Sequence, residues 1–225
     1  MNSNTKPVSA IVLHDVNGTG YAVSQHDVVD GKLGEGRISN VESLMNILSL
    51  FTTNNEVVFL PENVLINTST QLTWYTKPQK RNMFFKGNKH KRFHVPYPAL
   101  IWSVNISKRL LTVFALKSGE RPSLNTELFF APLGNINSQG QVCQGSARLP
   151  ETICLAAIPE IQDTVFDSNF TEIHNANNLA GNKGSRIRTH VKYWQDLHTN
   201  KADKFPVNDL VTTGKKANIL SSMLT

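Results

Sequence analysis

The chain has 225 residues, of which 40% are hydrophobic and 18% charged, and its formal net charge is +6 at pH 7. This composition suits a packed core, and no apolar run approaches the roughly 20 residues that span a bilayer. The first residues, Met1–Pro7, lack the basic-then-apolar organisation of a secretory signal. Two cysteines fit a reducing compartment, so we expect a soluble cytoplasmic protein.

The N-terminal quarter predicts a hairpin followed by a helix. Residues 10–13 and 21–23 are strand-like and are separated by Asn17-Gly18, a pair typical of tight hairpin turns. The run Ser39-Asn40-Val41-Glu42 has the pattern of a capping box. Apolar residues then recur at helical spacing up to Phe51, which predicts an amphipathic helix that ends near residues 52–55.

Four strand-like runs follow this helix, and we expect them to form an antiparallel meander. They cover residues 57–60, 72–75, 99–104 and 110–116. The last two runs are joined by the short segment 105–109, which favours antiparallel pairing. The run Met83-Phe84-Phe85 is predicted to complete or extend an edge of the sheet.

The C-terminal half predicts an irregular loop and then two helices. The loop carries Cys143, and Pro159-Glu160 begins a helix with its apolar residues on one face. A last helix is predicted over residues 188–198, docking on the core. The predicted fold class is therefore α+β: an N-terminal helix, a four-stranded antiparallel meander, the cysteine-bearing loop, then helices. We divide it into an extension (1–55), a core (56–175) and a C-terminal helix and tail (176–225).

One segment is strongly basic. No acidic residue occurs from Asn63 to Gly119, and the cationic residues there include Lys77, Arg81 and Arg92. Aromatic residues are interleaved with them, which is also seen in proteins that bind single-stranded nucleic acid. The simpler interpretation, which we favour, is a hairpin with core residues on one side and solvated lysines on the other.

The most informative segment is the loop from Asn135 to Cys143, with the sequence Asn-Ile-Asn-Ser-Gln-Gly-Gln-Val-Cys. Its turn-forming residues bend the backbone and hold Cys143 on a short, constrained segment. A thiolate placed there would attack an activated carbonyl, and the Asn135 carboxamide would hydrogen-bond the oxyanion that develops. The simpler alternatives are an ordinary loop cysteine and a turn asparagine that bonds its own backbone.

This loop resembles the active-site loop of ubiquitin-conjugating enzymes, in which a His-Pro-Asn triplet precedes an Asn-x-x-Gly-x-Ile/Val-Cys segment. The triplet here reads Leu133-Gly134-Asn135, so the asparagine is kept and the histidine is not. Further runs resemble the bacterial PRTRC system protein B, a prokaryotic branch of the ubiquitin-conjugating (UBC) superfamily. They are Val95-Pro96-Tyr97-Pro98-Ala99-Leu100-Ile101-Trp102, Val113-Phe114-Ala115-Leu116, Arg121-Pro122 and Val142-Cys143-Gln144-Gly145-Ser146-Ala147.

The resemblance implies a carrier that accepts a ubiquitin-like protein from a ThiF-type activating partner as a thioester on Cys143. It also implies a setting of plasmids or other mobile elements, with a JAB-type peptidase as a further partner. Two alternatives stay open: a non-catalytic adaptor that binds the ubiquitin-like or ThiF-like partner, and a plasmid-maintenance factor that binds nucleic acid. We expect no bound cofactor, because no nucleotide motif is present and ATP would be used by the activating protein.

Other candidate residues are given lesser roles. Family members often carry Phe-Thr-His after the post-cysteine helix, whereas this chain has Phe170-Thr171-Glu172-Ile173-His174, so we predict a surface or structural role for His174. Spacing does not place Glu151, Asp163 or Asp167 beside the thiol. Cys154, between Ile153 and Leu155, is predicted to be a buried core residue. His90 and His94 lack a third ligand, so no metal site is predicted.

Overall fold

The fold is taken from a computed structural model, which describes residues 7–18, 20–40, 42–44, 59–86, 91–145, 148–184 and 186–220. Contacts divide the chain into two compact units, Met1–Phe59 and Leu60–Thr225. We describe each unit by itself. The three-part division at residues 55 and 175 stays a prediction.

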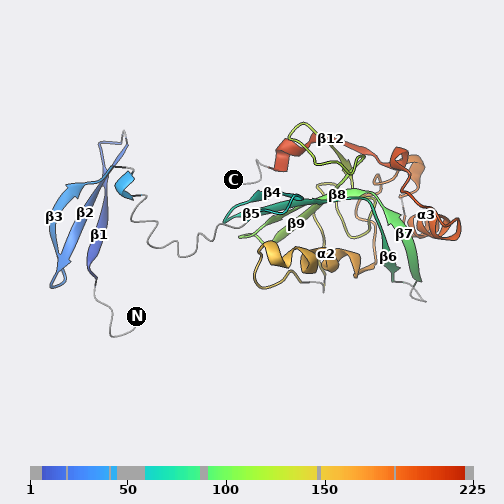
Figure 1. The fold of residues 1–225 in the computed structure, drawn as a ribbon, viewed down its shortest axis with the longest axis horizontal. Coiled ribbons are helices and arrows are strands. Elements are labelled where there is room, and N and C mark those ends of the chain that lie inside the picture. The colour runs from blue at the N-terminus through green and yellow to red at the C-terminus, as the bar shows by residue number, and fades with distance from the viewer. Residues whose placement is uncertain are drawn as a thin grey trace. The chain divides into compact units, whose positions relative to one another are not determined.

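The first unit is a three-stranded antiparallel sheet with the order β1-β2-β3, drawn as blue arrows in Figure 1. Its strands are β1 (Ser9–Asp15), β2 (Tyr21–Val29) and β3 (Lys32–Ile38). Both turns use left-handed residues: Asn17 and Gly18 have φ of 49° and 71°, and Asp30 and Gly31 have 49° and 75°. These conformations match the twist of a hairpin. The predicted Asn17-Gly18 hairpin is confirmed.

The predicted N-terminal helix lies mostly outside the described residues. Its start is described: residues 42–44 are helical, and the Asn40 side chain accepts a hydrogen bond from the Ser43 backbone N–H at 2.8 Å. Asn40 therefore caps the first turn. Of the predicted strand 57–60, only residues 59 and 60 are described, and they are not in a strand.

The second unit is built on a six-stranded antiparallel sheet with the order β12-β10-β9-β8-β5-β4. Its strands are β4 (Val64–Asn67), β5 (Gln71–Thr76), β8 (Ala99–Asn105), β9 (Leu110–Leu116), β10 (Glu127–Phe130) and β12 (Thr212–Lys216). The predicted strands 72–75, 99–104 and 110–116 correspond to β5, β8 and β9. Each of these strands is almost entirely buried, because its side chains meet core on both faces.

A second sheet of this unit has the order β11-β6-β7. The hairpin of β6 (Gln79–Phe85) and β7 (Lys91–Tyr97) is antiparallel, and the short β11 (Asn169–Phe170) pairs with β6 in parallel. This pairing brings residues 169–170 beside residues 84–85. The segment that follows β11 is thereby held beside this sheet, and it forms part of the site described below.

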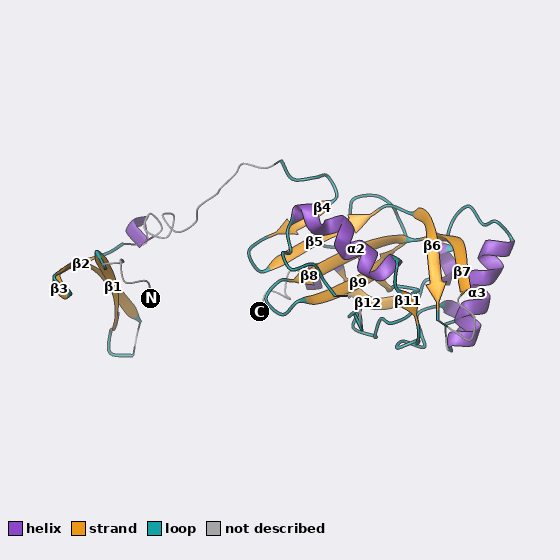
Figure 2. Ribbon diagram, turned by 90° about the horizontal axis from the view of Figure 1, so that it is seen from below, coloured by secondary structure: helices purple, strands orange, loops and turns teal. Residues whose placement is uncertain are grey.

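Two α-helices cover these sheets (Figures 1 and 2). They are α2 (Ile158–Phe166) and α3 (Ile187–Thr199), and both agree with the predicted helices. Phe166 of α2 packs edge-on against Trp102, which is stacked on Trp74 at 6.0 Å. Trp194 of α3 packs against Tyr97 of β7. The 3-10 helices are Leu155–Ala157, Ala180–Asn182, Val207–Asp209 and Ala217–Leu220.

The predicted fold class is wrong. The described residues form twelve strands in three sheets with few helices, rather than one four-stranded meander flanked by helices. The predicted meander is interrupted, because β6 and β7 leave the main sheet and β5 pairs with β8. Two of the strands that sequence reasoning missed, β3 and β12, are mostly polar and exposed. For example, every residue of β3 is exposed, so it shows no alternation of apolar residues.

Among the described helices, none combines the length and the apolar character that crossing a bilayer requires.

Candidate functional site

The loop that carries Cys143 is pinned to β9. The Val113 N–H donates to the Gly140 carbonyl at 2.8 Å, and the Val142 N–H donates to the Leu111 carbonyl at 2.9 Å. Gly140 has φ of 79°, and a Cβ at this position would lie 2.6 Å from the Phe114 ring. Only glycine meets both conditions. The turn predicted from the sequence therefore holds Cys143 by backbone contacts.

Asn135 ties this loop to a second segment. It adopts a left-handed conformation with φ of 57°, and its carbonyl accepts the Cys143 N–H at 2.8 Å. Its side-chain Oδ1 accepts hydrogen bonds from the Thr171 N–H, the Thr171 hydroxyl and the Glu172 N–H at 3.1–3.3 Å. Its Nδ2 donates to the Asn169 carbonyl at 3.2 Å. The side chain therefore bonds the segment 169–172 rather than its own backbone, and these bonds fix the orientation of the amide.

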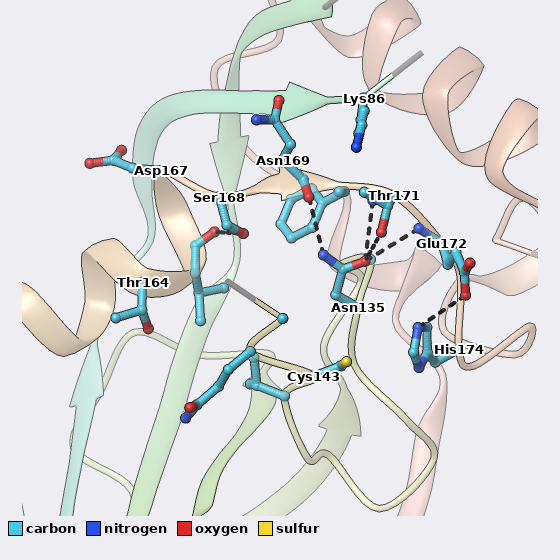
Figure 3. Close-up of a pocket in the computed structure, with 16 residues that line it drawn as sticks. Lys86, Asn135, Cys143, Thr164, Asp167, Ser168, Asn169, Thr171, Glu172 and His174 are labelled. Carbon is cyan, nitrogen blue, oxygen red and sulfur yellow. Dashed lines mark hydrogen bonds and ion pairs between the residues drawn. The ribbon is translucent and has the colours of Figure 1, made fainter. Parts of the chain in front are cut away.

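Cys143 and Asn135 line one open cavity of about 700 Å³. Its walls come from the end of β6, the loop 134–145, the end of α2 and the segment 167–174. In Figure 3 the Cys143 sulfur and the His174 ring are drawn on the side of Asn135 away from Lys86. The Cys143 side chain is exposed, so its thiol is open to a large reactant.

His174 is the residue of this cavity that sequence reasoning set aside. It lines the same walls as Cys143, and its Nε2 lies 3.5 Å from Glu172 Oε2. The imidazole is about one-third exposed, whereas the Glu172 carboxylate is largely exposed. An imidazole paired with a carboxylate is a common arrangement for moving a proton. The only sequence feature that could have pointed to His174 is the run Phe170–His174. Its first residue belongs to β11, and the pairing of β11 with β6 holds the run at the cavity.

The three acidic candidates differ in whether they line the cavity that contains Cys143. Asp167 lines the cavity. Asp163 does not line the cavity, and its carboxylate pairs instead with Arg81 at 2.9 Å. Glu151 is also outside the cavity, and its backbone carbonyl accepts a hydrogen bond from Arg109 at 3.2 Å. Of the three, only Asp167 lines the cavity, and Figure 3 draws its carboxylate pointing away from the Cys143 sulfur.

The expectation for Cys154 is wrong. Its side chain is exposed, while its neighbours Ile153 and Leu155 are the residues that pack against the core. Cys154 does not line the cavity of Cys143. The chain therefore has two exposed cysteines in different surroundings, which supplies a matched control for any test of the first.

The basic segment is partly neutralised. Lys80 pairs with Asp203 at 2.7 Å and lowers the pKa of that carboxyl below its usual range, and Arg81 is held by Asp163. The aromatic residues Trp74, Tyr75, Phe85 and Phe93 are buried, so their rings are not open for stacking on bases. His94 is exposed, and its predicted neighbour His90 lies outside the described residues. No cluster of metal-binding residues occurs in the part of the chain that is described.

Comparison with known proteins gives one match. Residues 40–213 match the family model described as prokaryotic E2 family D, which is more than half of the chain. A search of curated proteins and a search of solved structures each found no match.

Proposed function

Because this chain belongs to the prokaryotic E2 family D, we propose that Cys143 carries a ubiquitin-like protein as a thioester. The observation that carries the proposal is an exposed thiol on a hydrogen-bonded loop, at the edge of a cavity that also contains Asn135 and His174. The activating partner would be a ThiF-type protein that uses ATP, as the resemblance to PRTRC system protein B implies.

The first step is thioester exchange. The Cys143 thiolate attacks the carbonyl carbon of the thioester on the activating protein, a new C–S bond forms, and the donor thiolate leaves. The oxyanion of the tetrahedral intermediate needs a fixed hydrogen-bond donor. Nδ2 of Asn135 has two hydrogens and gives one to the Asn169 carbonyl. The second is the proposed donor to the oxyanion.

The second step is transfer to an amine. A neutral lysine amine attacks the carbonyl, the C–N bond forms, and Cys143 leaves as a thiolate. The amine must lose a proton, which requires a base within reach of the nitrogen. The His174 imidazole, oriented by Glu172, is the proposed base. The sequence analysis expected a surface or structural role for this residue, and the proposed role goes beyond it.

A second candidate is the adaptor, in which the same surface binds the ubiquitin-like or ThiF-like protein without chemistry. One observation favours it. Leu133, at the position of the triplet histidine, is fully buried, and Gly134 packs so closely on Phe170 that a Cβ would lie 2.8 Å from it. This part of the loop therefore serves packing in this chain, and any acid–base group must come from another segment.

A charging assay tests the carrier. The protein is incubated with ATP and with the ThiF-like and ubiquitin-like proteins encoded next to its gene. The mixture is then run on a gel without reductant. We expect a reductant-sensitive adduct that is absent in Cys143→Ala and unchanged in Cys154→Ala, because both thiols are exposed but only Cys143 lines the cavity. An adduct that persists in Cys143→Ala would refute the assignment. Stable co-purification without any adduct would favour the adaptor.

The role of His174 has its own test. We expect His174→Ala to load Cys143 at nearly the wild-type rate and to slow discharge onto free lysine roughly 10- to 100-fold, since only the second step needs a base. Pre-loaded protein is mixed with lysine at several pH values, and thioester decay is followed. Raising the pH should reduce the defect, because it supplies neutral amine directly. Equal losses in loading and discharge would instead indicate a structural role for His174.

A further inference from the structure

A second cavity, of about 200 Å³, adjoins the loop that carries Cys143. Gln141 lines it, whereas the next two residues, Val142 and Cys143, line the cavity described above. The loop therefore separates two cavities. The other walls come from the ends of β5, β8 and β9 and the turn between the last two: Gln71, Ser103, Asn105, Lys108, Leu110 and Thr112. Such a volume holds roughly seven water molecules, or a small metabolite in their place.

The strand register makes this part of the sheet polar. Residues directly opposite each other in neighbouring strands point to the same face. One row across the sheet is Thr73, Ser103, Thr112 and Gln141, and the row beside it is Gln71, Asn105 and Leu110. On the same face, the row on the other side is apolar: Tyr75, Ile101 and Phe114. The face therefore changes from packed core to polar cavity within one row.

Some of these polar side chains bond to one another. Gln71 and Ser103 are only 2% and 4% exposed. Nε2 of Gln71 donates to the Leu220 carbonyl at 2.6 Å, and it lies 2.9 Å from the Thr73 hydroxyl and 2.8 Å from the Ser103 hydroxyl. The two hydroxyls are 2.9 Å apart. This network holds one part of the cavity wall in place.

Three other groups of the wall have hydrogen-bond donors to spare. Thr112 is only 3% exposed, yet its hydroxyl bonds to no other described residue. Oε1 of Gln141 accepts from Asn137 Nδ2 at 3.1 Å, which leaves Nε2 of Gln141 without a partner among the described residues. Lys108 is exposed, and its ammonium is likewise unpaired within the described part of the chain. A buried hydroxyl without a partner is unfavourable, so a ligand that bonds it gains affinity.

We propose that this cavity binds a small molecule through a carboxylate group. The ligand is an anion, because Lys108 supplies a positive charge and none of the described residues that line the cavity is acidic. A carboxylate has about four acceptor positions on two oxygens, so it can accept from Lys108, Gln141 Nε2 and the Thr112 hydroxyl together. One lysine balances a single negative charge, which favours a carboxylate over a phosphate dianion. Binding makes no use of the Cys143 thiol.

Titration of the full chain with acetate, lactate and pyruvate in turn, followed by amide NMR spectra, tests the proposal. We expect saturable shifts of the Thr112 and Gln141 signals for at least one of them, with a Kd of about 1 mM, a realistic affinity for so small a ligand. Lactamide, which has the shape of lactate without its charge, should bind at least about 10-fold more weakly than lactate. No saturation by any of the three carboxylates up to about 20 mM would overturn the proposal. So would tighter binding of inorganic phosphate at the same signals.

Two variants locate the site within the fold. Lys108→Met should weaken binding roughly 10-fold, since a hydrogen bond to a charged group is lost, whereas Lys192→Met, which removes an exposed lysine of α3, should not. Thr112→Val should weaken binding by a similar factor without lowering the midpoint of urea unfolding, because the hydroxyl that it removes has no partner among the described residues.

Wild-type affinity in both Lys108→Met and Thr112→Val would overturn the assignment of the cavity. A Thr112→Val variant that loses stability and still binds would show that the hydroxyl serves packing, which would also contradict the proposal. Cys143→Ala should bind the carboxylate like the wild type, since Cys143 lines the other cavity. Binding is measured without the activating protein, so its failure is distinguishable from failure of the carrier assay.

Discussion

Gly140→Ala is expected to lower the free energy of unfolding by about 3 kcal/mol and to abolish loading of Cys143. The left-handed φ of 79° costs a non-glycine residue about 1 kcal/mol. The new Cβ would lie 2.6–3.0 Å from three carbons of the Phe114 ring, and forcing such a contact in a packed interior costs about 1–3 kcal/mol more. Phe114 is buried in a close-packed core, so its ring has little room to move aside. The loop must then leave β9 and take Cys143 with it.

Gly145→Ala is the matched control for this prediction. Gly145 has a positive φ of 52°, but a Cβ there has no neighbour within 4 Å among the described residues. Its cost should be only about 1 kcal/mol from the backbone conformation. Urea unfolding of both variants, with thioester charging on the same samples, separates strain from the collision with Phe114. Equal losses for the two variants would show that Phe114 does not confine the loop.

The second large effect is a dependence of stability on acid that arises at His190. This side chain is completely buried beside Phe85 and Trp194, and neither ring nitrogen makes a hydrogen bond of good geometry among the described residues. Burial lowers the pKa of His190 from 6.5 to about 3, an effect that the nearby Pro132 carbonyl partly opposes. The native protein therefore holds this imidazole neutral at every ordinary pH.

The direction of the effect follows from proton binding. Below about pH 6.5 the unfolded chain binds a proton at His190, and the native state does not do so until about pH 3. This residue's contribution to the unfolding free energy is thus constant above pH 6.5. It falls by about 1.4 kcal/mol per pH unit below it, to a total of about 5 kcal/mol.

His190→Leu should remove this contribution and flatten the pH dependence between pH 6.5 and 4. The measurement is chemical unfolding at a series of pH values, compared with wild type. His94→Leu, which removes an exposed histidine of β7, is the control and should keep the wild-type slope. A His190→Leu profile that runs parallel to the wild-type profile would mean that His190 is protonated in the native state.

Several elements could be predicted because their own residues determine them. Strands β5, β8 and β9 are short runs of β-branched and aromatic residues that are buried on both faces. Pro159 near the start of α2 and the apolar stripe of α3 mark the two helices. The Asn17-Gly18 turn carries a strong local preference. In each case local preference and tertiary position agree.

The missed strands depend on their neighbours instead. β12 has the sequence Thr-Thr-Gly-Lys-Lys and is a strand only because β10 offers it an edge. β11 is two residues long and is defined by its parallel pairing with β6. For β3 a signal was present, since Asp30-Gly31 is a typical two-residue turn. The strand was still missed, because the residues of β3 are all exposed and include glycine, so they show no alternation of apolar and polar residues.

The candidate site also has a part that could be predicted from the sequence and a part that could not. Asn135 and Cys143 are eight residues apart, and one loop brings them to one cavity, as the spacing suggested. Their chemical roles remain proposals. His174 lies 31 positions beyond Cys143 in the sequence and reaches the cavity only through β11 and the Asn135 side chain. No local pattern encodes such a contact, so the sequence alone did not bring His174 and Cys143 to the same cavity.

The walls of the Cys143 cavity come from segments that lie far apart in the sequence, and this has a consequence for the chain while it is being synthesised on the ribosome. These walls come from Lys86, the loop around Asn135 and Cys143, and the segment ending at His174. Pairing of residues 84–85 with 169–170 must close a loop of more than 80 residues, which is slow relative to local hairpins. The thiol is therefore translated well before its cavity can assemble. During that interval Cys143 is an ordinary accessible thiol, and its reactivity at this stage depends on the redox state of its surroundings.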